Sequence, residues 1–198
     1  MSSSPASPPV PDTDPDATPG SVIRSVFRWR GEGGRHLDDH IAEEVPVAFV
    51  YNSEPFAVMM ATPADLEDFA TGFALSEGIV AARGDLVIER IEQLIEGIEI
   101  RMTIPDHRAE ALAQRRRSMS GRSGCGVCGS ELLEAALRYP PPVRTDVRIT
   151  VPAQRRALRE LRAGQTINAR TGATPAAGWA ALDGALQLVR EDVGRHNA

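Results

Sequence analysis

Short apolar runs separated by turn-forming residues predict β-strands in the first half of the chain. The β-like pattern begins at Val22. Two of the runs, Val45 to Tyr51 and Phe56 to Ala61, flank the sequence Asn52-Ser53-Glu54-Pro55, whose composition is typical of a turn. Further strands are expected at the remaining apolar runs, which are Leu86–Ile91, Ile98–Ile104 and Leu186–Arg190.

A helical pattern follows the run that ends at Ala61. We expect Thr62 to cap the helix, with Pro63 at its first position. Asp65 can complete a capping box, and Gly78 follows the last turn. Apolar residues at three- and four-residue spacing form a face that packs on a core: Leu66, Phe69, Ala70, Phe73 and Ala74. Two more helices are expected, at Glu131–Arg138 and Pro152–Ala163.

Strands and helices interleave along the chain, which favours a mixed α/β or α+β fold. Residues 1–20 are rich in Ser, Pro and Asp and almost lack bulky apolar side chains, so we expect them to form a disordered tail. A polar, arginine-rich run from Gln114 to Ser123 is expected to lead into the segment that carries the cysteines.

Composition limits the chemistry and the partners of the chain. All 22 basic residues are arginine, which excludes Schiff-base catalysis and a lysine-dependent phosphate loop. The net charge of −5 comes largely from three aspartates within the first twenty residues. The nearly neutral remainder gives no general attraction to nucleic acid or to anionic membranes. Without a membrane-length apolar stretch, a secretory leader or a disulfide framework, we expect a cytoplasmic protein with no membrane partner.

The sequence Gly124-Cys125-Gly126-Val127-Cys128-Gly129 is the most informative in the chain. Glycines around two thiols allow backbone conformations in which successive N–H groups converge on an anion. Ser130 can cap a following helix, and Arg122 adds a positive charge. Such surroundings favour thiolate over thiol, and a thiolate in a glycine loop suits the uptake and release of sulfur.

The Cys-x-x-Cys spacing also occurs in zinc sites and in dithiol oxidoreductases. His36 and His40, at helical i,i+4 spacing, could add two zinc ligands, although their position so far ahead of the cysteines matches no familiar finger. A thioredoxin-like site would follow a buried strand, whereas an Arg/Ser/Gly-rich segment precedes this loop. A zinc deaminase needs His-x-Glu, which none of the four histidines forms. The spacing alone therefore leaves metal binding and thiol chemistry open.

Five motifs resemble, in the same order, those of the FdhD family of formate dehydrogenase accessory sulfurtransferases. They are Asn52–Pro55, Met60–Pro63 with Gly72–Ile79, Ser123–Gly129, Thr171–Thr174 and Glu191–Ala198. The resemblance covers roughly residues 40–198.

The resemblance implies a β-rich part with one helix, residues 21–110, before a cytidine-deaminase-like α/β core, residues 111–198, that is truncated at its C-terminus. It implies a cytoplasmic homodimer in which sulfur from a cysteine desulfurase is held as a persulfide. The sulfur then passes to the bis-guanylyl molybdopterin form of the molybdenum cofactor before insertion into formate dehydrogenase. Cys125 corresponds to the persulfide carrier and Cys128 to its helper.

The molybdenum cofactor would be a transient ligand, with no tightly bound cofactor and no metal site. The residues that bind it stay unassigned. The alternative is a zinc-binding or scaffolding module with Cys125 and Cys128 as ligands.

Two departures from the family pattern bear on these expectations. Pro175 stands where the family has a histidine after Thr174, so a proton-transfer or cofactor role of that histidine does not carry over. The sequence ends at Ala198 where the family continues, so we expect it to be a fragment.

Arginines near both ends of the core are secondary candidates. Arg115, Arg116, Arg117 and Arg122 could contact cofactor phosphates or an acidic patch of the desulfurase, or form a solvated loop. Arg195 and His196 are hypothesised to face the cofactor phosphates or to buffer a proton near the sulfur.

Overall fold

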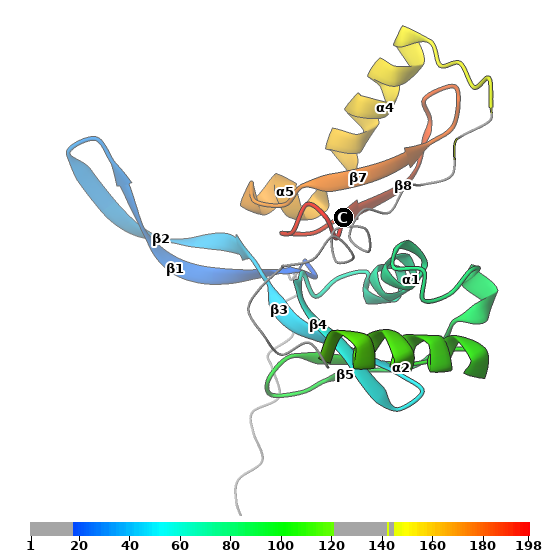
Figure 1. Cartoon of the computed structure of the whole chain (residues 1–198). Helices are drawn as coiled ribbons and strands as arrows, with labels where there is room; N and C mark the ends of the chain where they lie inside the picture. Colours follow the sequence, from blue (N-terminus) through cyan, green and yellow to red (C-terminus); the bar gives the residue numbers. More distant parts are fainter. Residues whose placement is uncertain (1–17, 121–141, 143–144) are drawn as a thin grey trace, which may run out of the picture.

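The computed structural model describes residues 18–120, 142 and 145–198 (Figure 1). The N-terminal tail to residue 17 and the segment expected to contain a helix at residues 131–138 lie outside the described residues. The strands are β1 Ser21–Arg30, β2 Gly33–Ala42, β3 Val45–Tyr51, β4 Glu54–Ala61, β5 Val87–Gln93, β6 Ile98–Thr103, β7 Ala176–Ala180 and β8 Leu186–Glu191. The helices are α1 Leu66–Ser76, α2 Asp106–Ser120, α4 Val151–Gly164 and α5 Thr166–Thr171, with a 3₁₀ turn at Arg83–Asp85.

A four-stranded mixed sheet, in the order β4-β3-β6-β5, forms the centre of the fold. The central strands β3 and β6 pair in parallel, and the two edge strands pair antiparallel to them. Alternation along β3 and β6 buries one face of the sheet beneath α1 and α2. Phe49 stacks on Phe73 of α1 with ring centroids 4.5 Å apart. The expected strands and the expected apolar face of α1 are confirmed.

The remaining elements form two further units. One is the β7–β8 unit, in which helix α4 packs along the β7–β8 hairpin on the side away from α1 (Figure 1). The other is the β1–β2 hairpin, which projects away from the body. The mixed α/β fold class is confirmed. The division into a tail, a β-rich part and a deaminase-like core stays a prediction.

The start of α1 corrects the capping prediction. The helix begins at Leu66, and Asp65 precedes it with a left-handed φ of 50° and no side-chain cap. Thr62 lies outside the helix, where its hydroxyl accepts a hydrogen bond from the backbone N–H of Val193 at 2.9 Å. The prediction of Thr62 as the cap and Pro63 as the first helical residue was wrong because a distant segment uses the threonine.

Two other local predictions need correction. The polar run that begins at Gln114 is helical up to Ser120, because α2 starts at Asp106 and packs Ala109 and Leu112 on the core. His36 and His40 lie on the extended strand β2, so their spacing is not that of one helical turn. Helix α5 and strand β7 had no sequence signal strong enough to predict them.

Candidate functional site

The cysteine loop lies outside the described residues, as do Arg122 and Ser130. Arg115, Arg116 and Arg117 belong to the last turns of α2, which leads into that loop. The roles of Cys125 and Cys128 therefore stay predictions. Three of the other motifs, Met60–Pro63, Thr171–Thr174 and Glu191–Ala198, meet in a second part of the fold that the structure describes in full.

A buried junction joins the segment after β4 to the segment after β8. The carboxylate of Asp192, which is 5% exposed, accepts the backbone N–H of Thr62 at 2.8 Å and that of Gly194 at 2.7 Å. The side-chain amide of Asn197 donates to the same carboxylate at 3.1 Å and to the carbonyl of Met60 at 3.0 Å. Three donors thus compensate the desolvation of this carboxylate.

The carboxylate of Glu191, the preceding residue, points toward α5 and not toward Thr62. It accepts the backbone N–H groups of Ile167 and Asn168 at 2.9 and 2.8 Å, at the start of α5. The hydroxyl of Thr174 donates to it at 2.9 Å. The Glu191 carboxylate therefore satisfies N–H groups that the short helix leaves without partners.

The adjacent carboxylates of Glu191 and Asp192, at the end of β8, thus connect this strand to α5 and to the segment after β4. Thr62, Thr174, Glu191 and Asp192 make up four of the five buried polar or charged residues of the described chain. Thr62 is more than 100 residues from the other three in sequence, and the fold brings its motif into contact with theirs. Burial of so many hydrogen-bonded polar groups makes this junction sensitive to substitution.

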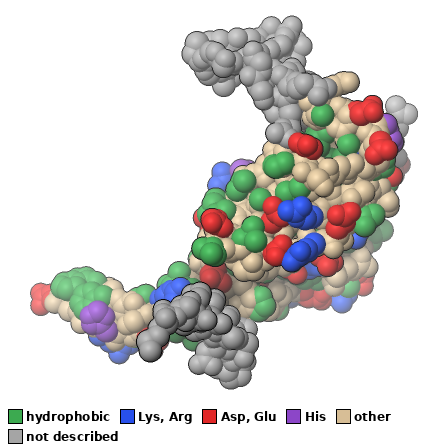
Figure 2. Space-filling view, turned by 90° about the horizontal axis from the view of Figure 1, so that it is seen from below, with side chains coloured by type: hydrophobic (Ala, Val, Ile, Leu, Met, Phe, Trp, Pro, Cys, Tyr) green, Lys and Arg blue, Asp and Glu red, His purple; other side chains and the backbone are tan. Residues whose placement is uncertain are grey.

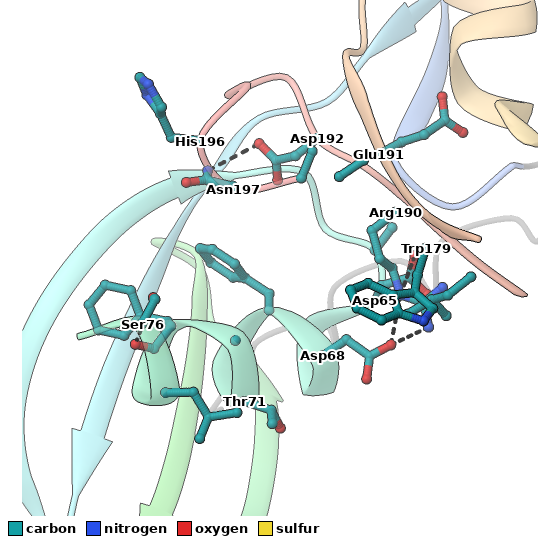
Figure 3. Close-up of a pocket in the computed structure, with 18 of the residues that line it drawn as sticks. Asp65, Asp68, Thr71, Ser76, Trp179, Arg190, Glu191, Asp192, His196 and Asn197 are labelled. Atoms are coloured by element: carbon teal, nitrogen blue, oxygen red, sulfur yellow. Dashed lines mark hydrogen bonds and ion pairs between the residues drawn. The ribbon is translucent and has the colours of Figure 1, made fainter. Parts of the chain in front are cut away.

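An open pocket of about 700 Å³ lies beside the junction, between α1 and the β7–β8 hairpin (Figure 3). Its apolar wall includes Phe69 and Phe73 of α1 and Leu188 of β8. Trp179 of β7 also lines it and is 71% exposed. An apolar wall with an exposed indole suits a flat, partly aromatic ligand.

An ion pair crosses this pocket. The guanidinium of Arg190 on β8 pairs with the carboxylate of Asp68 on α1 and lies 3.6 Å from that of Asp65 (Figure 3). Its Nη1 also donates to the carbonyl of Val189 at 2.6 Å. This contact links α1 to β8 at the surface. Sequence reasoning assigned Asp65 to a helix cap and gave Asp68, Arg190 and Trp179 no role, since none of the four lies in a pattern that predicts a pocket.

The predicted residues near the C-terminus are at the rim of the site. His196 lines the pocket and Arg195 lies next to it, and both side chains are exposed. Among the described residues, no group of three or more His, Cys, Asp or Glu side chains is arranged to hold a metal ion. Within the same residues, no helix has the length and apolar character needed to span a membrane.

A sequence model of the FdhD/NarQ family matches residues 42–198. The chain belongs to this family. It is 57% identical over 180 residues to the sulfur carrier protein FdhD of Xanthomonas axonopodis pv. citri (strain 306), covering 91% of this chain and 64% of that protein. It is 49% identical over 174 residues to the sulfur carrier protein FdhD of Cupriavidus necator, covering 88% of this chain and 60% of that protein.

The FdhD fold is also found among solved structures. A formate dehydrogenase accessory protein from Desulfotalea psychrophila superposes with a TM-score of 0.62 and 25% sequence identity, over 90% of this chain and 64% of that one. The chain therefore spans less than two thirds of the length of these FdhD relatives.

Within the FdhD framework, Pro175 has a defined place at the junction. Its carbonyl accepts the backbone N–H of Asp192 at 3.3 Å, and the residue before it is Thr174, the hydrogen-bond partner of Glu191. The position at which the resemblance leads one to expect a histidine thus contacts the backbone of Asp192 and follows the residue that bonds to Glu191.

Proposed function

We propose that the chain is a sulfur carrier that holds one sulfur atom as a persulfide on Cys125. The observation that carries this proposal is the glycine-flanked Cys125-Gly126-Val127-Cys128 sequence in a chain whose relatives are named sulfur carrier protein FdhD. The exclusive use of arginine and the absence of His-x-Glu from the sequence argue against lysine-dependent and deaminase chemistry.

The proposed uptake step is a thiolate exchange. The thiolate of Cys125 attacks the outer sulfur of a persulfide on a cysteine desulfurase, and a new S–S bond forms on Cys125. The S–S bond of the donor breaks, and its cysteine leaves as a thiolate. One sulfur atom moves without a net change in the number of electrons.

The proposed release step gives Cys128 a role. Its thiolate attacks the inner sulfur, that of Cys125, and the two cysteines form a disulfide while the outer sulfur leaves as sulfide. The outer sulfur is reduced by two electrons to sulfide, and the two cysteines supply these electrons as they are oxidised to the disulfide. The acceptor is the bis-guanylyl molybdopterin form of the molybdenum cofactor, which is a substrate of the carrier and is afterwards inserted into formate dehydrogenase.

The pocket beside Trp179 is the described surface that best suits part of such a large ligand. The exposed indole offers a stacking face, and the apolar wall formed with α1 offers a dry surface. We further propose that the carrier acts in the cytoplasm as a homodimer, with the desulfurase and formate dehydrogenase as protein partners. Reduced thiols are favoured in that compartment.

Intact-mass measurement after incubation with a cysteine desulfurase and cysteine tests the carrier function. We expect the chain to gain the mass of one sulfur, which a thiol reductant removes. Cys125→Ala should abolish the gain, whereas Cys128→Ala should retain it and slow the release of sulfide.

A matched set of results would contradict the carrier function. Stoichiometric zinc in the purified chain, lost in Cys125→Ala and Cys128→Ala alike and accompanied by no gain of sulfur, would establish the zinc-binding alternative. A reversible disulfide between the two cysteines without sulfur uptake would indicate a redox dithiol. Circular dichroism of each variant checks that the fold is retained.

A further inference from the structure

The hairpin formed by β1 and β2 has two chemically different faces. Its strands pair over their whole length, with Ser21 opposite Ala42 at the base and Arg30 opposite Gly33 at the tip. Successive side chains of a strand point to opposite faces. Near the tip, one face therefore carries aromatic residues and the other carries arginines. The family model begins at residue 42, so the match does not include this hairpin tip.

The aromatic face orders the tip. Phe27 lies between its cross-strand partner His36, with ring centroids 5.0 Å apart, and Trp29 at 6.0 Å. Gly34 makes this packing possible, because a Cβ there would lie 2.4 Å from the Phe27 ring. Figure 2 shows hydrophobic and histidine side chains gathered on this hairpin, which extends to the left of the body. The cluster holds the two strands together beyond the body, where a bare two-stranded ribbon would be marginal.

The opposite face places like charges next to one another. Arg28 and Arg35 are direct cross-strand partners, and Arg30 follows two residues after Arg28 on the same face. Like charges in directly opposite positions destabilise a strand pair. Arg28 is compensated by the carboxylate of Asp39 at 2.5 Å. In the described part of the chain, neither Arg30 nor Arg35 has an ion-pair partner.

The three arginines surround a hollow of about 320 Å³. Arg28, Arg30 and Arg35 line it together with Gly33 and Gly34, and no acidic side chain is among the lining residues. A Cβ added at Gly33 would meet nothing within 4 Å, so the backbone is open at that point. Guanidinium groups bind phosphate oxygens in a planar, bidentate geometry and are the side chains best suited to that anion.

We propose that the arginine face of the hairpin tip is a binding site for the phosphate or diphosphate group of a soluble ligand. The anion would lie in the hollow, accept hydrogen bonds from Arg30 and Arg35, and remove the repulsion between Arg35 and Arg28. The aromatic cluster on the reverse face keeps the arginines in place before the anion arrives. The described residues that line this site all belong to the hairpin, and the proposal does not depend on whether Cys125 carries sulfur.

Titration of the chain with inorganic diphosphate, at an ionic strength held constant with chloride, tests the proposal. Isothermal calorimetry should give a saturable one-site isotherm. Arg30→Gln and Arg35→Gln should each weaken binding by at least about tenfold, the loss expected when a charge-assisted hydrogen bond is removed. Arg24→Gln is the matched control, because Arg24 is on the same face but lies opposite Asp39 near the base. It should change the affinity by less than about twofold.

Trp29 reports whether each variant keeps its hairpin. In a Trp179→Phe background it is the only tryptophan of the chain, and its emission should be the same in all three arginine variants. Equal loss of binding in Arg24→Gln and Arg30→Gln would show a general charge effect and overturn the site. So would binding of hexaglutamate as tight as that of diphosphate, which would point to an acidic peptide instead. Binding to phosphatidylglycerol vesicles without binding of free diphosphate would indicate a membrane surface, and would also overturn it.

Discussion

The hydroxyl of Tyr51 is buried without a hydrogen-bond partner among the described residues. The ring is 2% exposed and packs edge-on against Phe56, so the apolar part of the side chain belongs to the core. Burial raises the pKa of this phenol above its ordinary value, with a smaller contribution from the charge of Glu77. The side chain therefore contributes packing, while its polar atom costs stability.

Tyr51→Phe separates these two effects. It removes the buried hydroxyl and keeps the ring, so we expect the free energy of unfolding to rise by about 1 kcal/mol in urea denaturation at pH 7. Tyr51→Ala, which removes the ring as well, should lower it by about 3–5 kcal/mol. A loss of stability in Tyr51→Phe would show that the hydroxyl has a partner outside the described residues.

The pH dependence of the same variant has a definite sign. Because the folded pKa of Tyr51 is raised, the folded state retains the phenol proton that the unfolded state loses above about pH 10. The wild type should therefore lose stability as the pH rises beyond that value, and Tyr51→Phe should lose less. Urea midpoints at pH 8 and at pH 10.5 measure the difference, and parallel curves for both proteins would contradict the assigned pKa direction.

At the scale of elements, a carboxylate of α4 adds a polar contact to the packing of this helix against β8. Glu160 accepts the backbone N–H of Leu186 at 2.8 Å and the Nε of Arg156 at 2.7 Å. These two interactions lower the pKa of Glu160, the backbone hydrogen bond being the larger cause. The carboxylate is at the surface, so its effect should be small and sensitive to salt.

Glu160→Gln tests this attachment through its pH dependence. A lowered folded pKa gives stability that is present above the ordinary glutamate pKa of about 4.3 and is lost as the pH falls through the folded value. The variant should therefore be less stable than the wild type at pH 7, and the gap should be smaller at pH 3. Glu110→Gln, an exposed glutamate on α2, is the control and should show no such gap at either pH. A gap of the same size at pH 3 as at pH 7 would mean that packing rather than charge is involved.

Periodicity predicted the elements that bury a regular stripe, and long-range contacts explain where it failed. The strands at Val45–Tyr51 and Ile98–Thr103, and the face of α1 with Phe69 and Phe73, follow directly from apolar spacing. Thr62 looks like a helix cap in sequence but bonds to Val193, which is 131 residues away. No part of helix α2 was predicted, because its arginines hide the apolar spacing, although arginine is a good helix former.

For the candidate site, sequence motifs identified the segments but not their geometry. Glu191 and Asp192 were assigned to one motif, yet nothing in the sequence shows that their carboxylates point into different units. The pocket residues Asp68, Trp179 and Arg190 come from three elements, and only the fold brings them together. Cys125 and Cys128 stay predictions from the sequence, since their loop is outside the described residues.

At the scale of the whole molecule, we expect Asp192 to couple the unfolding of the β7–β8 unit to that of the central sheet. Its carboxylate joins the end of β8 to Thr62, next to the central sheet, while Glu191 holds the start of α5. Asp192→Asn replaces an oxygen by an NH₂ group, which faces the N–H of Thr62 or of Gly194 instead of accepting from it. Leaving such a buried donor without an acceptor costs about 1–3 kcal/mol. Asp146→Asn, at an exposed position, is the control and should change little.

Two probes of unfolding show whether Asp192→Asn weakens the coupling between the β7–β8 unit and the central sheet. In a Trp29→Phe background, the emission of Trp179 follows the β7–β8 unit, and far-UV circular dichroism follows the whole chain. The two urea transitions should coincide in the parent protein, as in a cooperative two-state reaction. In Asp192→Asn the Trp179 transition should move to lower urea than the circular dichroism transition, because the attachment of the β7–β8 unit to the sheet is weakened. If both transitions moved together, Asp192 would contribute to overall stability without coupling the two units.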